Sequence, residues 1–185
     1  MKIICKEIQM DSGKLSTIKG SSNGNLTVGK EYIVLVVYYD NPHGLGFQIE
    51  CDEGDLMIPS ANRFDLVSNY LPSNWEIIFK PISEGSHYFQ LAPRAWNKAR
   101  FEGETADAYR PNFYEAIIDV NTPLEGLEGW RKYPPEQIPE VVKVYFQEKD
   151  IIYQEEAAYE KANASGFSKP SSILLNLIKN GNSST

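Results

Sequence analysis

The side chains that most often catalyse reactions or bind metals are few in this chain and far apart. Its histidines are His43 and His87, and its cysteines are Cys5 and Cys51. A structural zinc site needs such ligands clustered at turn or helix spacing, which these four residues do not show. The acidic turn Asp52-Glu53-Gly54-Asp55 lacks the further oxygen ligands of a calcium loop. We therefore expect no bound metal.

Motifs for phosphate binding and for nucleophilic catalysis are also missing from the sequence. Gly44-x-Gly46 has no third glycine, and no helical pattern follows it. No serine lies in a nucleophile-elbow sequence, and neither cysteine lies in a catalytic signature. Glu102, Glu104 and Asp107 are spaced closely enough to act as an acid-base pair, as carboxylates in any acidic loop are. We expect a protein that is not an enzyme and has no cofactor. A hydrolase with a dispersed acid pair is the third of our three hypotheses.

The charge of the chain is distributed unevenly. The net charge is −7. Residues 1–100 hold 10 basic and 11 acidic side chains, whereas residues 101–185 hold 8 basic and 14 acidic ones. An acidic surface repels phosphate backbones, so we expect no nucleic-acid partner and instead expect a basic protein. Acidic surfaces also serve solubility alone, which is the simpler explanation of the charge.

Acidic and aromatic residues alternate in residues 101–136. Large rings are common anchors at protein interfaces, and flanking carboxylates attract a basic partner. Packing between the sheet and a C-terminal helix accounts for about two thirds of such rings, because aromatic side chains are mostly buried. The acidic turn supplies a second candidate surface. The predicted partner-binding residues are Asp52, Glu53, Asp55, Glu102, Glu104, Asp107, Tyr109 and Trp130.

The elements that must position these residues differ between the two parts of the chain. Residues 1–91 show short stretches of β-branched and aromatic residues, separated by turns that contain glycine, proline, asparagine or aspartate. This pattern predicts an antiparallel barrel or rolled sheet. The predicted strands cover residues 2–8, 30–39, 46–51, 56–58, 63–67, 75–79 and 87–91.

Residues 92–185 are predicted to contain helix and to pack on the sheet, so that the chain forms one compact α+β unit. A short helix is expected to begin at Pro93. Apolar residues at three- and four-residue steps predict a long amphipathic helix over about residues 139–163, with Glu155 on its polar face. A further amphipathic turn is expected over residues 173–178.

The N-terminal sequence and the cysteines indicate a cytoplasmic protein. Residues 1–7 contain charges inside the apolar stretch and no cleavage site, which is typical of an edge strand and not of a signal peptide. No stretch is long and apolar enough to cross a membrane. We expect Cys5 and Cys51 to be buried, reduced thiols; a disulfide requires that their strands be neighbours.

The stretch Leu26-Thr27-Val28-Gly29-Lys30-Glu31-Tyr32-Ile33-Val34-Leu35 resembles the opening of a group of small bacterial SH3-like barrels. The resemblance covers roughly residues 25–100. It continues through Asp52-Glu53-Gly54, Pro59, Phe64, Val67, Pro72-Ser73-Asn74-Trp75 and Leu91-Ala92-Pro93-x-x-Trp96. Proteins of this kind often resemble immunity proteins of contact-dependent growth inhibition and other polymorphic toxin systems. The matching residues look structural, so the resemblance assigns no binding residue.

The resemblance implies an immunity protein that binds one cognate toxin as a monomer and covers the toxin's active site. A basic nuclease is the toxin that fits the acidic surface best. The alternative is an SH3-like adaptor that binds a cytosolic protein or peptide through an aromatic groove on the barrel. Charge reversal at Glu102, Glu104 and Asp107 separates the two hypotheses, because it weakens binding only in the first.

Overall fold

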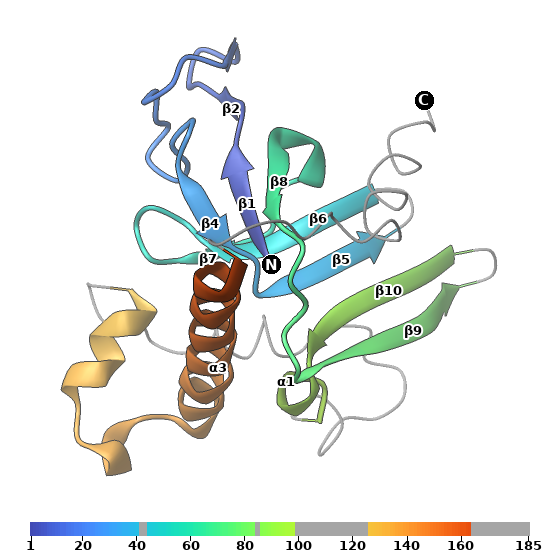
Figure 1. Cartoon of the computed structure of the whole chain (residues 1–185), viewed down its shortest axis with the longest axis vertical. Helices are drawn as coiled ribbons and strands as arrows, with labels where there is room; N and C mark the ends of the chain where they lie inside the picture. The colour runs from blue at the N-terminus through green and yellow to red at the C-terminus, as the bar shows by residue number, and fades with distance from the viewer. Residues whose placement is uncertain (41–43, 84–85, 99–125, 164–185) are drawn as a thin grey trace.

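The protein has an α+β fold, in which antiparallel sheets are followed by one long helix. The computed structural model describes residues 1–40, 44–83, 86–98 and 126–163 (Figure 1). The strands are β1 (Lys2–Cys5), β2 (Ile8–Gln9), β3 (Leu15–Ser16), β4 (Glu31–Ile33), β5 (Val36–Asp40), β6 (Gly44–Glu50), β7 (Leu56–Met57), β8 (Phe64–Ser68), β9 (Trp75–Ser83) and β10 (Ser86–Pro93). The helices are α1 (Arg94–Lys98) and α3 (Glu140–Asn163), with 3-10 turns η1 (Ala61–Arg63), η2 (Leu127–Lys132) and η3 (Pro135–Gln137).

The described strands form three sheets. The largest has five strands in the order β7-β6-β5-β10-β9, and a second has three in the order β4-β1-β8. Strands β2 and β3 form a separate two-stranded ribbon, which extends from the body of the molecule (Figure 1). Each of these pairings is antiparallel, as the sequence predicts. Closure into an SH3-like barrel stays a prediction, as does the division into residues 1–91 and 92–185.

The stretch predicted as one strand over residues 30–39 is divided between two sheets. β4 pairs with β1, whereas β5 pairs with β6 and β10. Between them, the Val34 amide donates to the Met1 carbonyl at 3.0 Å and the Leu35 amide donates to the Gln48 carbonyl at 2.8 Å. The chain therefore leaves one sheet and joins the other within two residues. The run of apolar residues hides this break because both halves are buried.

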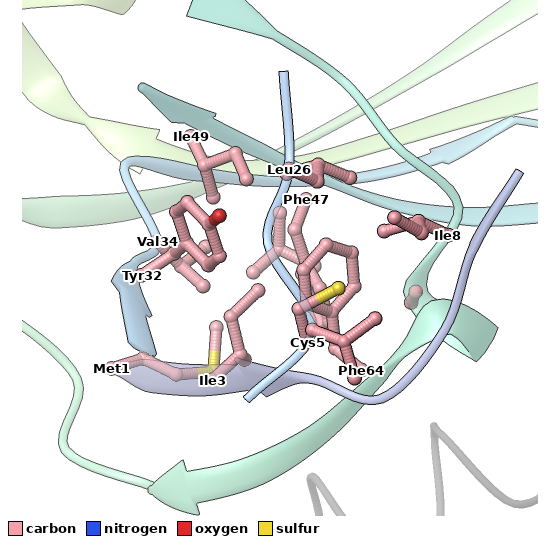
Figure 2. Close-up of a cluster of buried hydrophobic side chains, with 13 residues drawn as sticks. Met1, Ile3, Cys5, Ile8, Leu26, Tyr32, Val34, Phe47, Ile49 and Phe64 are labelled. Carbon is pink, nitrogen blue, oxygen red and sulfur yellow. The ribbon is translucent and has the colours of Figure 1, made fainter. Parts of the chain in front are cut away.

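Alternating side chains of the five-stranded sheet enter two separate cores. Val37, Phe47 and Ile49 face the three-stranded sheet, where they meet buried residues of β1, β4 and β8. Figure 2 shows this first core, with Phe47 and Phe64 among its labelled side chains. The two rings make an edge-to-face contact at 6.3 Å, a favoured aromatic geometry. The first core thus joins the two sheets into one layered body.

The second core lies on the other face of the five-stranded sheet, beneath α3. It contains Val36, Tyr38 and Ala92 from the sheet together with Val142, Tyr145 and Ile152 from the helix. Trp96 of α1 stacks on Tyr145, with ring centroids 5.7 Å apart. The predicted short helix and long helix are both present, and the apolar stripe of the long helix faces the sheet as expected.

Glu155 lies on the polar face of α3, as the sequence predicts, and its side chain is partly exposed. Its carboxylate accepts hydrogen bonds from the Tyr70 hydroxyl at 2.8 Å, the Ser73 amide at 2.8 Å and the Ser73 hydroxyl at 2.6 Å. The linker between β8 and β9 therefore contacts the helix at this position, and residues distant in sequence bind Glu155.

Some further predictions from the sequence are confirmed by the structure, and others are not. Cys5 and Cys51 are both buried and are not bonded to each other, in agreement with the prediction. The β2–β3 ribbon was not predicted, because its strands have only two residues each. The expected turn over residues 173–178 lies outside the described residues. Among the helices of the described residues, none has the length and apolar character needed to span a membrane.

Candidate functional site

The predicted partner-binding residues divide into two groups in the structure. Glu102, Glu104, Asp107 and Tyr109 lie outside the described residues, so their role stays a prediction. Asp52, Glu53 and Asp55 form the turn between β6 and β7, and Trp130 lies in η2. The described part of the candidate site therefore consists of the acidic turn and the segment that begins at Gly126.

The acidic turn is closed by its own backbone. The Cys51 amide donates to the Asp55 carbonyl at 2.8 Å, and the Gly54 amide donates to the Cys51 carbonyl at 3.1 Å. Gly54 has a φ of 86°, in the left-handed region that glycine adopts without steric cost. These local bonds give the turn one conformation and fix the direction in which its side chains leave the backbone.

Asp52 points inward and fastens the turn to the three-stranded sheet. Its carboxylate accepts hydrogen bonds from the Thr27 hydroxyl at 2.7 Å and the Tyr32 hydroxyl at 2.9 Å, and it pairs with the Lys30 ammonium at 2.5 Å. The Asp52 amide also donates to the Asn25 carbonyl at 2.8 Å. Asp52 thus has a structural role in the described part of the chain, which its position in an acidic turn does not reveal.

These contacts determine the ionisation of Asp52. Partial burial alone would raise the pKa of this carboxyl. The hydrogen bonds from Lys30, Thr27 and Tyr32, together with the Lys30 charge, outweigh that effect and hold the pKa below its usual range. Because the folded-state pKa is lowered, the carboxylate stabilises the fold above the pKa of the unfolded chain, about 3.9. That stabilisation is lost as the pH falls through the folded-state pKa.

The lowered pKa of Asp52 predicts that the effect of Asp52→Asn on stability depends on pH. We expect the variant to have a lower free energy of unfolding than the wild type at pH 7. The difference between the two should shrink as the pH falls below about 3.9, the pKa of the unfolded chain, toward the lowered pKa of the folded state. Urea unfolding monitored by circular dichroism at pH 7, 5, 4 and 3 measures it. A difference that stays constant with pH would show that shape, and not charge, makes Asp52 stabilising.

Glu53 and Asp55 differ from Asp52 in their surroundings. Both side chains are exposed, and neither forms an ion pair with a described residue. The Glu53 carboxylate extends toward Gly24, where a Cβ added to that glycine would lie 3.4 Å from the carboxylate Oε1 atom. With respect to the described residues, the turn therefore presents two negative charges without an ion-pair partner, from a backbone that Asp52 and the local hydrogen bonds hold in place.

The segment that contains Trp130 packs directly against this turn. Gly126 has a φ of 71°, and a Cβ added there would lie 3.3 Å from the Gly54 carbonyl oxygen and 3.5 Å from that of Glu53. Only glycine combines this conformation with so close an approach. The structure thus brings together the acidic turn and the start of η2, which are more than 70 positions apart in the sequence.

Trp130 itself is only half-exposed. Its ring packs against the second core and lies 5.0 Å from the ring of Tyr133. Tyr133 has 43% of its surface exposed and is the more accessible of the two. The sequence placed Tyr133 within the aromatic segment but did not single it out. An interface here would use the Tyr133 ring together with the exposed edge of Trp130.

A buried ion-pair network beneath this surface was not predicted at all. The Lys149 ammonium contacts both oxygens of Glu50 at 2.5 Å and one oxygen of Glu128 at 2.6 Å. The Tyr145 hydroxyl also donates to Glu50, and burial together with the Glu50 charge raises the Tyr145 pKa well above its usual value. The network connects β6, η2 and α3. Its only sequence signal is that Lys149 falls on the same helical face as Tyr145 and Ile152.

The side chains of this site are of the kinds that take part in protein recognition. In the part of the chain that the structure describes, no group of histidine, cysteine, aspartate and glutamate side chains is arranged to hold a metal. Carboxylates on a fixed turn, next to half-exposed rings, are suited to charge-assisted hydrogen bonds with lysine or arginine. Comparisons with protein-family models, curated proteins and solved structures found no match.

Proposed function

We propose that this protein is a non-enzymatic binding protein that neutralises a basic bacterial toxin as an immunity protein. The observation that carries the proposal is the fixed acidic turn, on which Glu53 and Asp55 are exposed and unpaired among the described residues. Because the backbone of the turn is fixed, it loses little conformational freedom on binding, so more of the interaction energy contributes to affinity. The resemblance of residues 25–100 to SH3-like barrels of toxin systems supplies the choice of toxin over other basic partners.

The proposed mechanism is occlusion of the toxin's active site in a complex of one toxin and one immunity protein. A nuclease cleft must attract phosphate groups, and it therefore carries lysine and arginine side chains. Glu53 and Asp55 would pair with such residues and compete with the nucleic acid for them. Attraction between opposite charges also speeds association, and it weakens as ionic strength rises.

This function predicts a loss of affinity when the turn is made basic. The partner to use is the product of the gene beside the one that encodes this protein, and the measurement is isothermal titration calorimetry at about 150 mM salt. For the double variant Glu53→Lys, Asp55→Lys we expect binding at least about 30-fold weaker than that of the wild type, because two attractive contacts become repulsive.

A charge-matched control separates the turn from net charge. Asp11→Lys, Asp65→Lys changes the net charge by the same amount at two exposed positions. Asp65 pairs with Lys6 at 3.3 Å, but an exposed pair of this kind contributes little to stability. We expect the control to reduce affinity by less than about threefold. Equal losses in the two variants would mean that the turn is not a specific contact, and no binding by the wild type would exclude this partner.

The adaptor hypothesis requires an exposed aromatic groove on the sheets. Among the side chains whose exposure the structure describes, which do not include those of residues 78–88, the large exposed hydrophobic ones include two aromatic residues, Tyr39 and Tyr133. Tyr39 lies on β5, and Tyr133 follows η2. The toxin-binding proposal is therefore the one that the described surface supports better. Charge reversal at Glu102, Glu104 and Asp107 tests whether that segment contributes to the same interface.

A further inference from the structure

An open cleft of about 370 Å³ lies beside the acidic turn. It is formed where β4, the end of β6 and α3 meet. Lys30 and Tyr32, which bind Asp52 of the turn, line one side of it. The cleft and the turn therefore belong to one continuous surface. The remaining lining residues are Lys2, Glu31, Ile33, Glu50, Cys51 and Tyr153.

The ammonium groups of the cleft already bind carboxylates. Lys30 pairs with Asp52 at 2.5 Å, and Lys2 pairs with Glu160 and, at 3.3 Å, with Glu31. An anionic ligand would have to displace these partners and approach further carboxylates. The lining side chains and the groups paired with them hold four carboxylates and three ammonium groups, so the cleft has a small excess of negative charge. These carboxylates belong to Glu31, Glu50, Asp52 and Glu160, and the ammonium groups to Lys2, Lys30 and Lys149.

Two features of the cleft favour a cation as its occupant. Glu31 has 49% of its side-chain surface exposed, and its ion pair with Lys2 is the longest at the cleft. One oxygen of this carboxylate can therefore accept hydrogen bonds from a ligand. The tyrosine rings already attract cations: Lys30 lies 5.4 Å from the ring centroid of Tyr32, and Lys149 lies 5.2 Å from that of Tyr153.

We propose that this cleft receives an arginine side chain of the basic protein partner. Guanidinium is planar, stacks on tyrosine rings and donates paired hydrogen bonds to a carboxylate, which matches Tyr153 and Glu31 better than a compact ammonium does. Ile33 provides an apolar wall for the methylene groups of the side chain. The inference rests on the proposed function for the source of the arginine, but the chemistry of the cleft can be tested without the partner.

The test is a titration of the isotope-labelled protein with N-acetyl-arginine amide, followed by NMR chemical shifts. We expect shifts at Glu31, Ile33 and Tyr153 with a dissociation constant on the order of 1 mM. N-acetyl-citrulline amide, which has nearly the same shape but no charge, should bind at least about fivefold more weakly, and so should the lysine analogue. Equal shifts with arginine and citrulline, or shifts only at residues outside the cleft, would overturn the proposal.

Two variants separate this inference from the proposed function. Glu31→Gln should weaken binding of the arginine amide by about threefold or more, because a charged acceptor becomes neutral. Glu136→Gln, at another exposed glutamate, should leave it unchanged. Glu53→Lys, Asp55→Lys should weaken binding of the toxin but still allow the arginine amide to enter the cleft. If the wild-type protein binds the toxin but not the arginine amide, the cleft proposal is wrong and the proposed function stands. If it binds the arginine amide but not the toxin, the proposed function is wrong and the cleft proposal stands.

Discussion

Lys149→Met is expected to lower the free energy of unfolding by about 3 kcal/mol, since it leaves the buried Glu50 carboxylate without its cation. The Lys149 side chain has 7% of its surface exposed, and that of Glu50 has 14%. Methionine retains most of the aliphatic stem, so the loss reports mainly on charge. Chemical denaturation at pH 7 measures it.

Two further variants make this prediction specific to the buried pair. Lys143→Met removes a lysine of the same helix that has 42% of its side chain exposed, and it should cost less than about 0.5 kcal/mol. Adding Glu50→Gln to Lys149→Met removes the unpaired charge and should restore about half of the lost stability. A cost below about 1 kcal/mol for Lys149→Met alone would contradict a desolvated ion pair at this position.

Phe47→Ala is expected to lower the free energy of unfolding by about 3–5 kcal/mol, because it empties the middle of the first core. Phe47 is 2% exposed and packs against Phe64 (Figure 2). It lies on β6, which is flanked by β5 and β7 in the five-stranded sheet. The surrounding backbone is therefore held on both sides and has little freedom to fill the cavity. Guanidinium denaturation followed by circular dichroism gives the value.

Leu15→Ala is the control for this cavity. Leu15 lies on β3 in the extended ribbon and is 62% exposed. Its truncation should change the free energy of unfolding by less than about 0.5 kcal/mol. Phe47→Leu, which fills most of the space, should cost less than half as much as Phe47→Ala. Similar costs for Phe47→Ala and Leu15→Ala would mean that the first core is not closely packed.

Periodicity made the general fold predictable. Alternating and β-branched stretches marked the strands, and the apolar stripe marked α3, because both depend on residues close together in sequence. The division at Val34 and Leu35 was not predictable in this way. Both neighbouring stretches are apolar and buried, and the break is imposed by Met1 and Gln48, whose carbonyl groups bind the two amides from different sheets.

The candidate site was predictable only in part, for a related reason. Composition identified the acidic turn, and Gly54 marked its left-handed position. The distinction between Asp52, which points inward, and its exposed neighbours depends on Thr27 and Tyr32, 25 and 20 positions away. Lys149 was likewise not singled out from the sequence, because its partner Glu50 is 99 positions away. Polar residues that acquire buried partners through tertiary structure leave little local signal in the sequence.

The polar contacts of α3 also bear on the order in which the chain folds. Asn74 donates to Glu148 across 74 positions, Lys149 reaches Glu50 across 99, and Lys2 reaches Glu160 across 158. Closing such long loops costs conformational entropy before any contact compensates for it, and non-local contacts of this kind slow folding. The strand hairpins involve much shorter loops. The hairpins β5–β6 and β9–β10 can therefore form first, and the last described helix docks later.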